Sequence, residues 1–427
     1  MNAGQFLELY ASNFYENSLW TLFVVLIYFI LFRKSFSSII DPLFLGVIAQ
    51  AFSASVVLVM YISDVIDVYY LYSFLATELA FLIGCFSFFR SPSLSKIDSS
   101  VFSGNEFRIF YLIFSIFFWM FSIFYIYSAG LALFVAESRL VTMQNLGVIS
   151  WFVDVLWSAA PLCFFIKKYI SKRTGLSDYL LLGAAFLFLL TKGGKSDFLP
   201  FVYSFFIVAH VFSVVKLQRY LVFVTLLVPT LLLIATAITL SIWEVNENVI
   251  FYVVKRLILF GDAFFQGYTD VFFESLPESG FVHYFFNSIY ATYCHIFGLV
   301  PNPKVVVGYE MSKFYYGVSE GMGANARHNI LGLYLFGPYG AVVFSFFCGF
   351  LLSFLRRGLY LSRGWLFTIF YVVINLFVHF IMIDPALAVG YFVKVFVVLG
   401  VVLIVSLLTK ALFFSHALVC DNVSACK

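Results

Sequence analysis

Long runs of apolar residues, separated by short polar stretches, fill most of this chain. A helix needs about 20 apolar residues, at a rise of about 1.5 Å each, to cross the hydrocarbon core of a bilayer. By this measure the pattern predicts eleven membrane-spanning helices, at residues 18–32, 40–62, 68–89, 108–128, 147–166, 176–191, 198–215, 220–243, 331–355, 365–383 and 390–409. We therefore expect an all-α, polytopic integral membrane protein, with residues 1–427 forming a single membrane domain.

Residues 244–330 form one long interruption of this pattern, between spans 1–8 (18–243) and spans 9–11 (331–410). The segment is too rich in aromatic residues for a solvated tail. Its polar residues recur at intervals of seven, four and four between Val249 and Phe273, at Lys255, Asp262, Gln266 and Asp270. One polar stripe on an otherwise apolar helix predicts an amphipathic helix that lies on or partly in the membrane.

The composition excludes a soluble domain, because 63% of the residues are hydrophobic and only 11% are charged. The net charge of +3 points to no nucleic-acid partner. The six cysteines are scattered, so we expect neither a disulfide framework nor a zinc site. The long loop has no DxD-like carboxylate pair, so no metal or other cofactor is expected.

The basic residues predict how the chain is oriented. With the N-terminus outside, most of the 25 Lys and Arg residues fall in inner loops, as the positive-inside rule requires. The N-terminus and the 244–330 loop are then extracytoplasmic, and residues 411–427 form a cytoplasmic tail. Outside the long loop, three cations break the rule: Arg139, Lys192 and Lys195.

These three cations are candidate anion ligands. Lys192 and Lys195 flank two glycines, so backbone N–H groups and two ammonium groups could converge on a phosphate. The alternative is a turn whose lysines reach lipid headgroups. Arg139 lies two residues after Glu137, and a loop ion pair between them is the simpler interpretation.

Two further basic motifs belong to the long loop. Lys255-Arg256 lies on the amphipathic helix, where the planar fork of Arg256 suits phosphate, although the pair could also touch lipid headgroups. Arg327-His328-Asn329 directly precedes the ninth span. A neighbouring arginine favours the neutral imidazole, which can accept a proton. We therefore interpret His328 as the candidate general base.

Four other histidines are weaker candidates: His210 and His379 fall inside apolar spans, and His283 and His295 lie among aromatic residues of the loop. We expect only two charged residues, Asp154 and Lys394, to lie deep within spans. A charge in the bilayer is costly, so each must face protein or water. A structural pairing and a substrate contact are both compatible with the sequence.

The layout and several motifs resemble the O-antigen polymerases, the Wzy-type oligosaccharide repeat-unit polymerases. The resemblance rests on the number of spans, the glycine-flanked basic turn, and a Lys-Arg-x5-Asp helix that opens a large outer loop (Lys255-Arg256…Asp262). It also rests on Arg327-His328-Asn329, which leads into the Gly-Pro-Tyr-Gly stretch at 337–340. It covers nearly the whole chain in layout and depends on pattern rather than on long motifs.

The resemblance implies a cofactor-independent, inverting glycosyltransferase on the periplasmic face of the bacterial inner membrane. Such an enzyme moves a growing glycan from undecaprenyl pyrophosphate to the non-reducing end of a lipid-linked repeat unit. His328 would be the base for the acceptor hydroxyl. The pyrophosphate would bind to Arg256, Arg327, Lys192, Lys195 and Arg139, supported by Lys255, Asp262 and Asn329. Membrane lipids, a chain-length regulator and a flippase of the same pathway are the implied partners.

Two alternatives remain. One is an O-antigen ligase, which uses the same donor with a lipid A-core acceptor, but its interval between His and Gly is usually longer. The other is a lipid-linked oligosaccharide flippase or another transporter. A transporter places its ionisable groups inside the spans, around a cavity at mid-depth. Because only Asp154 and Lys394 are expected to lie deep, the sequence favours an enzyme.

Overall fold

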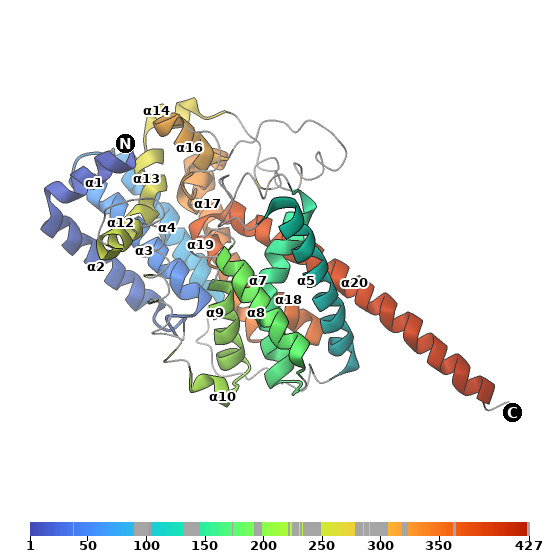
Figure 1. The fold of residues 1–427 in the computed structure, drawn as a ribbon. Coiled ribbons are helices and arrows are strands. Elements are labelled where there is room, and N and C mark those ends of the chain that lie inside the picture. The colour runs from blue at the N-terminus through green and yellow to red at the C-terminus, as the bar shows by residue number, and fades with distance from the viewer. Residues whose placement is uncertain are drawn as a thin grey trace. The chain divides into compact units, whose positions relative to one another are not determined.

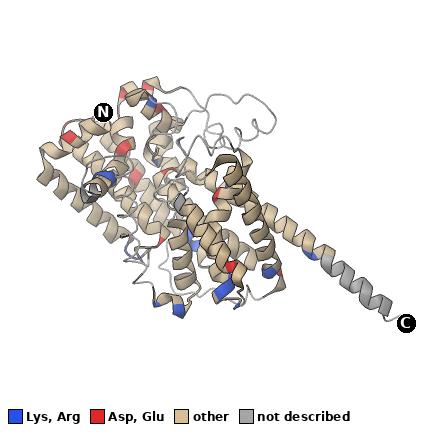
Figure 2. Cartoon of the chain, in the orientation of Figure 1, with Lys and Arg blue, Asp and Glu red and all other residues tan. Residues whose placement is uncertain are grey.

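The computed structural model is helical and contains no strand within the residues that it describes. These are residues 1–36, 38–88, 102, 104–130, 146–172, 174–191, 199–220, 223, 230, 233, 249–277, 285, 290, 306–317, 323–361 and 364–424. Among them, eight helices are long and apolar enough to cross a membrane, judged by length and composition. The all-α, polytopic character is thus confirmed, whereas eleven crossings and the extracytoplasmic loop stay predictions. Figure 2 shows how few charged residues the long helices carry.

The chain forms two compact units. Unit 1 comprises Met1–Ser95, Arg219–Leu361 and Asn375–Tyr391, and unit 2 comprises Lys96–Gln218, Ser362–Ile374 and Phe392–Lys427. The helices of unit 1 are α1 (Ala3–Ser12), α2 (Phe14–Phe32), α3 (Pro42–Ile62), α4 (Val68–Phe88), α12 (Val249–Ile258), η4 (Leu259–Gly261), α13 (Asp262–Gly267), α14 (Asp270–Ser275), α16 (Val307–Tyr316), α17 (His328–Leu359) and α19 (Phe380–Ile383). Those of unit 2 are α5 (Asn105–Ala129), α7 (Val148–Tyr169), α8 (Leu176–Thr191), α9 (Leu199–Phe206), η3 (Ile207–Val211) and α10 (Val215–Gln218). The helices α18 (Trp365–Leu376) and α20 (Pro385–Ser424) each run from one unit into the other.

Most predicted spans coincide with a helix, while the span at 220–243 falls largely outside the described residues. Local sequence explains where α3 begins: the carboxylate of Asp41 accepts a hydrogen bond from Leu43 N at 3.0 Å, and Pro42 occupies the first turn. At the other end of the chain, α20 continues through Ser424. The predicted tail at 411–427 therefore starts inside a helix.

In unit 1, α17 packs along α4 with direct backbone contact (Figure 1). A Cβ atom at Gly349 would lie 2.1 Å from Phe81 O, and one at Gly84 would lie 2.2 Å from Phe346 O. Two facing glycines thus let the helices approach more closely than any side chain would allow, as small residues do in membrane proteins. This contact anchors α17 against the helix that carries Glu78.

The helix α17 turns back on itself at Gly337. This residue has φ 66° and ψ −175°, a conformation that glycine tolerates, and Pro338 follows it. Ser345 Oγ lies 3.0 Å from His328 Nδ1, although 17 residues of straight helix would separate their backbones by about 25 Å. The arms 328–336 and 338–359 therefore form a helical hairpin, and the one long helix predicted at 331–355 is divided at Gly337.

The expected amphipathic helix at 249–273 is also interrupted. It divides into α12, η4, α13 and α14, and at the end of η4 Gly261 packs tightly against Val56 of α3. Gln266, predicted for the exposed stripe, is buried. The polar stripe therefore does not continue along one face.

In unit 2, the two charges predicted to lie deep form an ion pair. Lys394 Nζ of α20 lies 2.7 Å from Asp154 Oδ2 of α7. Asp154 is 5% exposed, so the lysine compensates a carboxylate that burial would otherwise destabilise. The sequence leaves open whether these two charges pair with each other or contact a substrate, and in the structure they pair with each other.

Candidate functional site

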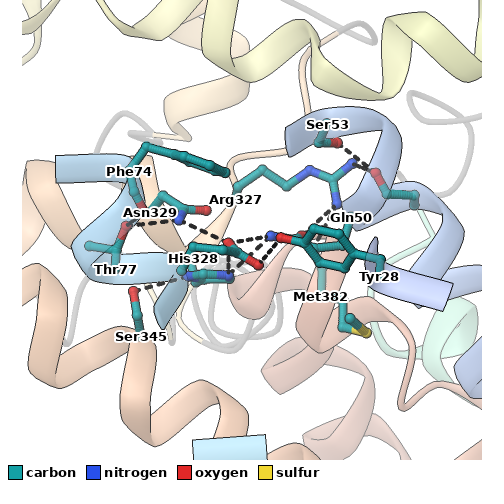
Figure 3. Close-up of polar contacts among 12 residues, drawn as sticks. Tyr28, Gln50, Ser53, Phe74, Thr77, Arg327, His328, Asn329, Ser345 and Met382 are labelled. Atoms are coloured by element: carbon teal, nitrogen blue, oxygen red, sulfur yellow. Dashed lines mark hydrogen bonds and ion pairs between the residues drawn. The ribbon is translucent and has the colours of Figure 1, made fainter. Parts of the chain in front are cut away.

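The first residues of α17 form the centre of a buried polar network in unit 1 (Figure 3). Arg327, His328 and Asn329 are each at most 1% exposed. Arg327 is the N-cap of α17, and the two residues after it open the short arm of the hairpin. The three neighbours point to different partners, so each has its own role in the network.

His328 is held between three groups. Its ring stacks on Phe81 at 4.4 Å between centroids, with an interplanar angle of 11°. On one side Nδ1 lies 3.0 Å from Ser345 Oγ, and on the other Nε2 lies 3.6 Å from Glu78 Oε2. A base oriented by a carboxylate on one nitrogen and facing a hydroxyl on the other has the arrangement that general-base catalysis requires.

Glu78 lies in the middle of α4 and is not among the residues predicted for the site. It is 6% exposed, and its carboxylate accepts hydrogen bonds from Tyr28 OH, from Gln50 Nε2 at 2.8 Å and from Asn329 Nδ2 at 3.3 Å. The expectation that only Asp154 and Lys394 lie deep was therefore wrong. A sequence signal was present, because Glu78 is the sole acidic residue in the apolar run at 68–89.

The guanidinium of Arg327 binds backbone carbonyl groups. Nη1 donates to Met382 O at 2.8 Å and Nη2 donates to Phe260 O at 2.7 Å, with longer contacts of 3.4 Å to Gln50 Oε1 and Ala49 O. Met382 and Phe260 lie in α19 and η4, short helical segments whose last carbonyls have no partner within the helix. Burial lowers the pKa of Arg327 to about 10, so it is positively charged at pH 7. The guanidinium of Arg327 therefore connects α19 and η4 to the start of α17.

Asp262 lies at the start of α13, close enough to Arg327 for a favourable charge interaction. Its Oδ1 atom is 2.8 Å from Ala263 N. Burial raises the pKa of this carboxyl to about 6, and the positive charge of Arg327 partly opposes that rise. Asp262, predicted as a supporting residue, is thus coupled to the network through Arg327.

The remaining predicted residues are less closely connected. Arg256 is exposed on α12, where its Nε lies 3.2 Å from Tyr252 OH and its guanidinium covers the Tyr252 ring. Lys255 is half-buried beside it. The structure gives no position for several other candidates, which lie outside the described residues: Arg139, Lys192, Lys195, His283 and His295. Of the two histidines expected within spans, His379 is buried in unit 1 and His210 stacks on Phe206 in unit 2.

An apolar pocket of about 180 Å³ lies along the long arm of α17 in unit 1. It is lined by Phe285, Phe344, Phe347, Cys348, Leu351, Ile381, Pro385, Ala388 and Val389. Phe344 of this lining directly precedes Ser345 in the chain, although the two side chains face different directions on the helix. Within the described part of the chain, no group of three His, Cys, Asp or Glu side chains could hold a metal ion.

No protein-family model, curated protein or solved structure matches this chain. The chemistry of the network and of the pocket is therefore the basis for a functional proposal.

Proposed function

We propose that this protein is a membrane glycosyltransferase of the O-antigen polymerase type. It would transfer a growing glycan from undecaprenyl pyrophosphate to a lipid-linked repeat unit, on the periplasmic face of the inner membrane. The observation that carries the proposal is the placement of His328 between Ser345 and Glu78, in a unit that also contains an apolar pocket. A transferase for lipid-linked sugars needs a base and a lipid-binding surface close together.

His328 supplies the base. An acceptor sugar hydroxyl must lose its proton as it attacks, and an imidazole with a fixed orientation can accept it. The Nδ1 atom already faces a hydroxyl, that of Ser345, at hydrogen-bond distance. The negative charge of Glu78 compensates the positive charge that the ring acquires.

The apolar pocket accommodates part of the lipid carrier. Its side chains are aliphatic and aromatic apart from the thiol of Cys348, which suits an isoprenoid chain and not a hydrated oligosaccharide. The pocket and the network both lie along α17 in unit 1. An apolar pocket on the helix that carries the base favours an enzyme that acts on a lipid-linked substrate.

The exposed Arg256 is better suited to bind the pyrophosphate than Arg327 is. Both terminal nitrogens of Arg327 are bonded to carbonyl oxygens, whereas Arg256 is exposed on an amphipathic helix. Lys192, Lys195 and Arg139 remain proposed ligands on the basis of the sequence. Arg327 then contributes by holding α19 and η4 in place around the start of α17.

A transporter for lipid-linked oligosaccharides is the second candidate, favoured by one observation. The short arm of α17 begins beside Glu78 and Gln50, near the middle of two candidate spans. Half-helices that start at mid-depth, next to ionisable residues, are a feature of many transporters. The apolar lining of the adjacent pocket argues for the enzyme instead.

The cellular phenotype of His328→Ala separates these functions. For a polymerase, cells should still make and export single repeats, so lipid A-core should carry one repeat instead of long chains. His379→Ala, a second buried histidine of unit 1, is the matched control and should retain long chains. Loss of all repeats would support the ligase or the transporter, and unchanged long chains would remove His328 from the chemistry.

A further inference from the structure

We propose that Glu78, His328 and Ser345 form a proton relay, with the proton of the neutral imidazole on Nε2 and its lone pair on Nδ1. In this relay Ser345 passes the proton of the acceptor hydroxyl to His328. The position of the proton on the ring is inferred from the contacts of His328, whereas the relay also rests on the proposed glycosyl transfer. Neither Glu78 nor Ser345 was a candidate from the sequence.

The surroundings of Glu78 suit an ionised carboxylate. Three donors converge on its two oxygens: Tyr28 OH, Gln50 Nε2 and Asn329 Nδ2. An ionised carboxylate only accepts hydrogen bonds, so this set satisfies it without requiring a proton on the acid. The same Oε2 atom that accepts from Gln50 and Asn329 lies 3.6 Å from His328 Nε2.

Two neighbours have opposite effects on whether His328 Nε2 carries a proton. Glu78 Oε2, 3.6 Å from Nε2, favours a proton on that nitrogen, while Gln50 Nε2, at 3.4 Å, would donate to an Nε2 lone pair. At 3.6 Å the carboxylate is too far away for a hydrogen bond, and it acts on the ring through its charge, which is strong in a buried site and opposes a lone pair on Nε2. The contact from the Gln50 amide is long and neutral, and the amide makes its short bond, of 2.8 Å, to Glu78. The carboxylate therefore prevails, and Nε2 carries the proton.

Ser345 behaves differently from other buried serines on helices of this chain. Ser353, on the same arm of α17, lies 2.9 Å from Phe350 O of its own helix and 3.2 Å from Gly84 O, and Ser53 of α3 lies 2.7 Å from both Ala49 O of its own helix and Phe260 O. A bond to a carbonyl of the same helix is the usual arrangement for a serine in a helix. Among the described residues, Ser345 instead has its hydrogen bond with His328 Nδ1, at 3.0 Å. The hydroxyl is thus aimed at Nδ1, which accepts its proton in the proposed tautomer.

The acceptor hydroxyl oxygen attacks the anomeric carbon of the donor sugar, and its proton moves to Ser345 Oγ. The Ser345 proton moves to His328 Nδ1, which becomes an imidazolium opposite the Glu78 carboxylate. The bond from the anomeric carbon to the phosphate oxygen breaks, and undecaprenyl pyrophosphate leaves with that electron pair. Glu78 is a positioning residue, because it acts through His328.

Solid-state NMR of the full-length protein in nanodiscs, with ¹⁵N-labelled histidine, tests the tautomer directly. The six histidines give few signals, and His328→Asn identifies the one of interest. We expect the neutral wild-type ring to carry its proton on Nε2, and Glu78→Gln to shift this preference toward Nδ1. A proton on Nδ1 in the wild type overturns the proposal, whatever the activity of the protein.

Kinetics with a lipid-linked repeat unit tests the relay. Ser345→Ala and Glu78→Gln should lower kcat on the order of 10²-fold with little change in KM, as for loss of a general-base function. Ser345→Thr, which keeps the hydroxyl, should recover most of that loss, and Ser353→Ala should equal the wild type. Wild-type kcat in Ser345→Ala overturns the relay. Full activity in His328→Ala instead contradicts the proposed function, and the NMR result then still decides the tautomer.

Discussion

At the scale of single residues, the motif Arg327-His328-Asn329 was found from the sequence but its partners were not. Its position before an apolar run made it visible. Glu78 and Ser345 are an isolated acid and a common serine inside predicted spans; the packing of α17 on α4 brings Glu78 to His328, and the turn at Gly337 brings Ser345 to it. Neither contact has a local sequence pattern, because both depend on how the helices fold against each other.

Arg327 supports the fold in this structure, so its loss should lower stability as well as activity. Arg327→Ala leaves Met382 O and Phe260 O without their donor, at a cost of about 1–3 kcal/mol for each buried group. Arg327→Lys should recover only part of this, because an ammonium cannot span both carbonyls. Thermal unfolding in detergent measures the effect.

Arg256→Ala is the matched control for that experiment. Its guanidinium is exposed, so its removal should leave the unfolding temperature unchanged and shorten the polymer. An unfolding temperature for Arg327→Ala equal to the wild type would contradict the role of Arg327 in joining α17 to its neighbours. Full-length polymer from Arg256→Ala would remove Arg256 from the proposed pyrophosphate site.

Asp262 should make stability depend on pH. The pKa of its carboxyl rises from 3.8 to about 6 on folding, so the folded state binds the proton more tightly. The resulting destabilisation is fully present above pH 6 and disappears as the pH falls toward 3.8. The unfolding temperature of the wild type, relative to Asp262→Asn, should therefore rise between pH 7 and pH 5. A difference that does not vary with pH contradicts this.

At the scale of elements, the positions of most helices could be predicted and their interruptions could not. Apolar length locates a helix near 331–355, but it contains no information on whether the helix is straight. The Gly-Pro-Tyr-Gly stretch was noticed as a motif, yet the turn depends on the positive φ of Gly337 and on packing between the two arms. The same holds for the break at Gly261, which depends on contact with α3.

The hairpin in α17 predicts a disulfide that a straight helix forbids. A Cβ atom at Gly332 would lie 3.0 Å from Ala341 Cα, so Gly332→Cys with Ala341→Cys should cross-link under mild oxidation. The native cysteines must first be replaced. Val343→Cys with Leu352→Cys has the same spacing within one arm, where the residues are about 13 Å apart, and should not cross-link. Equal behaviour of the two pairs would contradict the hairpin.

At the scale of the whole molecule, the orientation in the membrane follows from the basic residues. We expect the N-terminus and residue 300 to be extracytoplasmic and Arg357 to be cytoplasmic. A reporter that is active only in the cytoplasm should work when fused after Arg357 and fail when fused after residue 300. Activity at residue 300 would place Arg256 on the wrong face for a periplasmic substrate.

Polymerisation by the purified protein is the most direct test of the proposed function. In nanodiscs supplied with undecaprenyl-pyrophosphate-linked repeat units, the wild type should release undecaprenyl pyrophosphate and form chains of several repeats. His328→Ala should lower the initial rate by about 10²–10⁴-fold, as expected for loss of a general base, measured on protein that is still folded at the assay temperature. Polymer formed by His328→Ala at the wild-type rate would contradict catalysis by the network around His328.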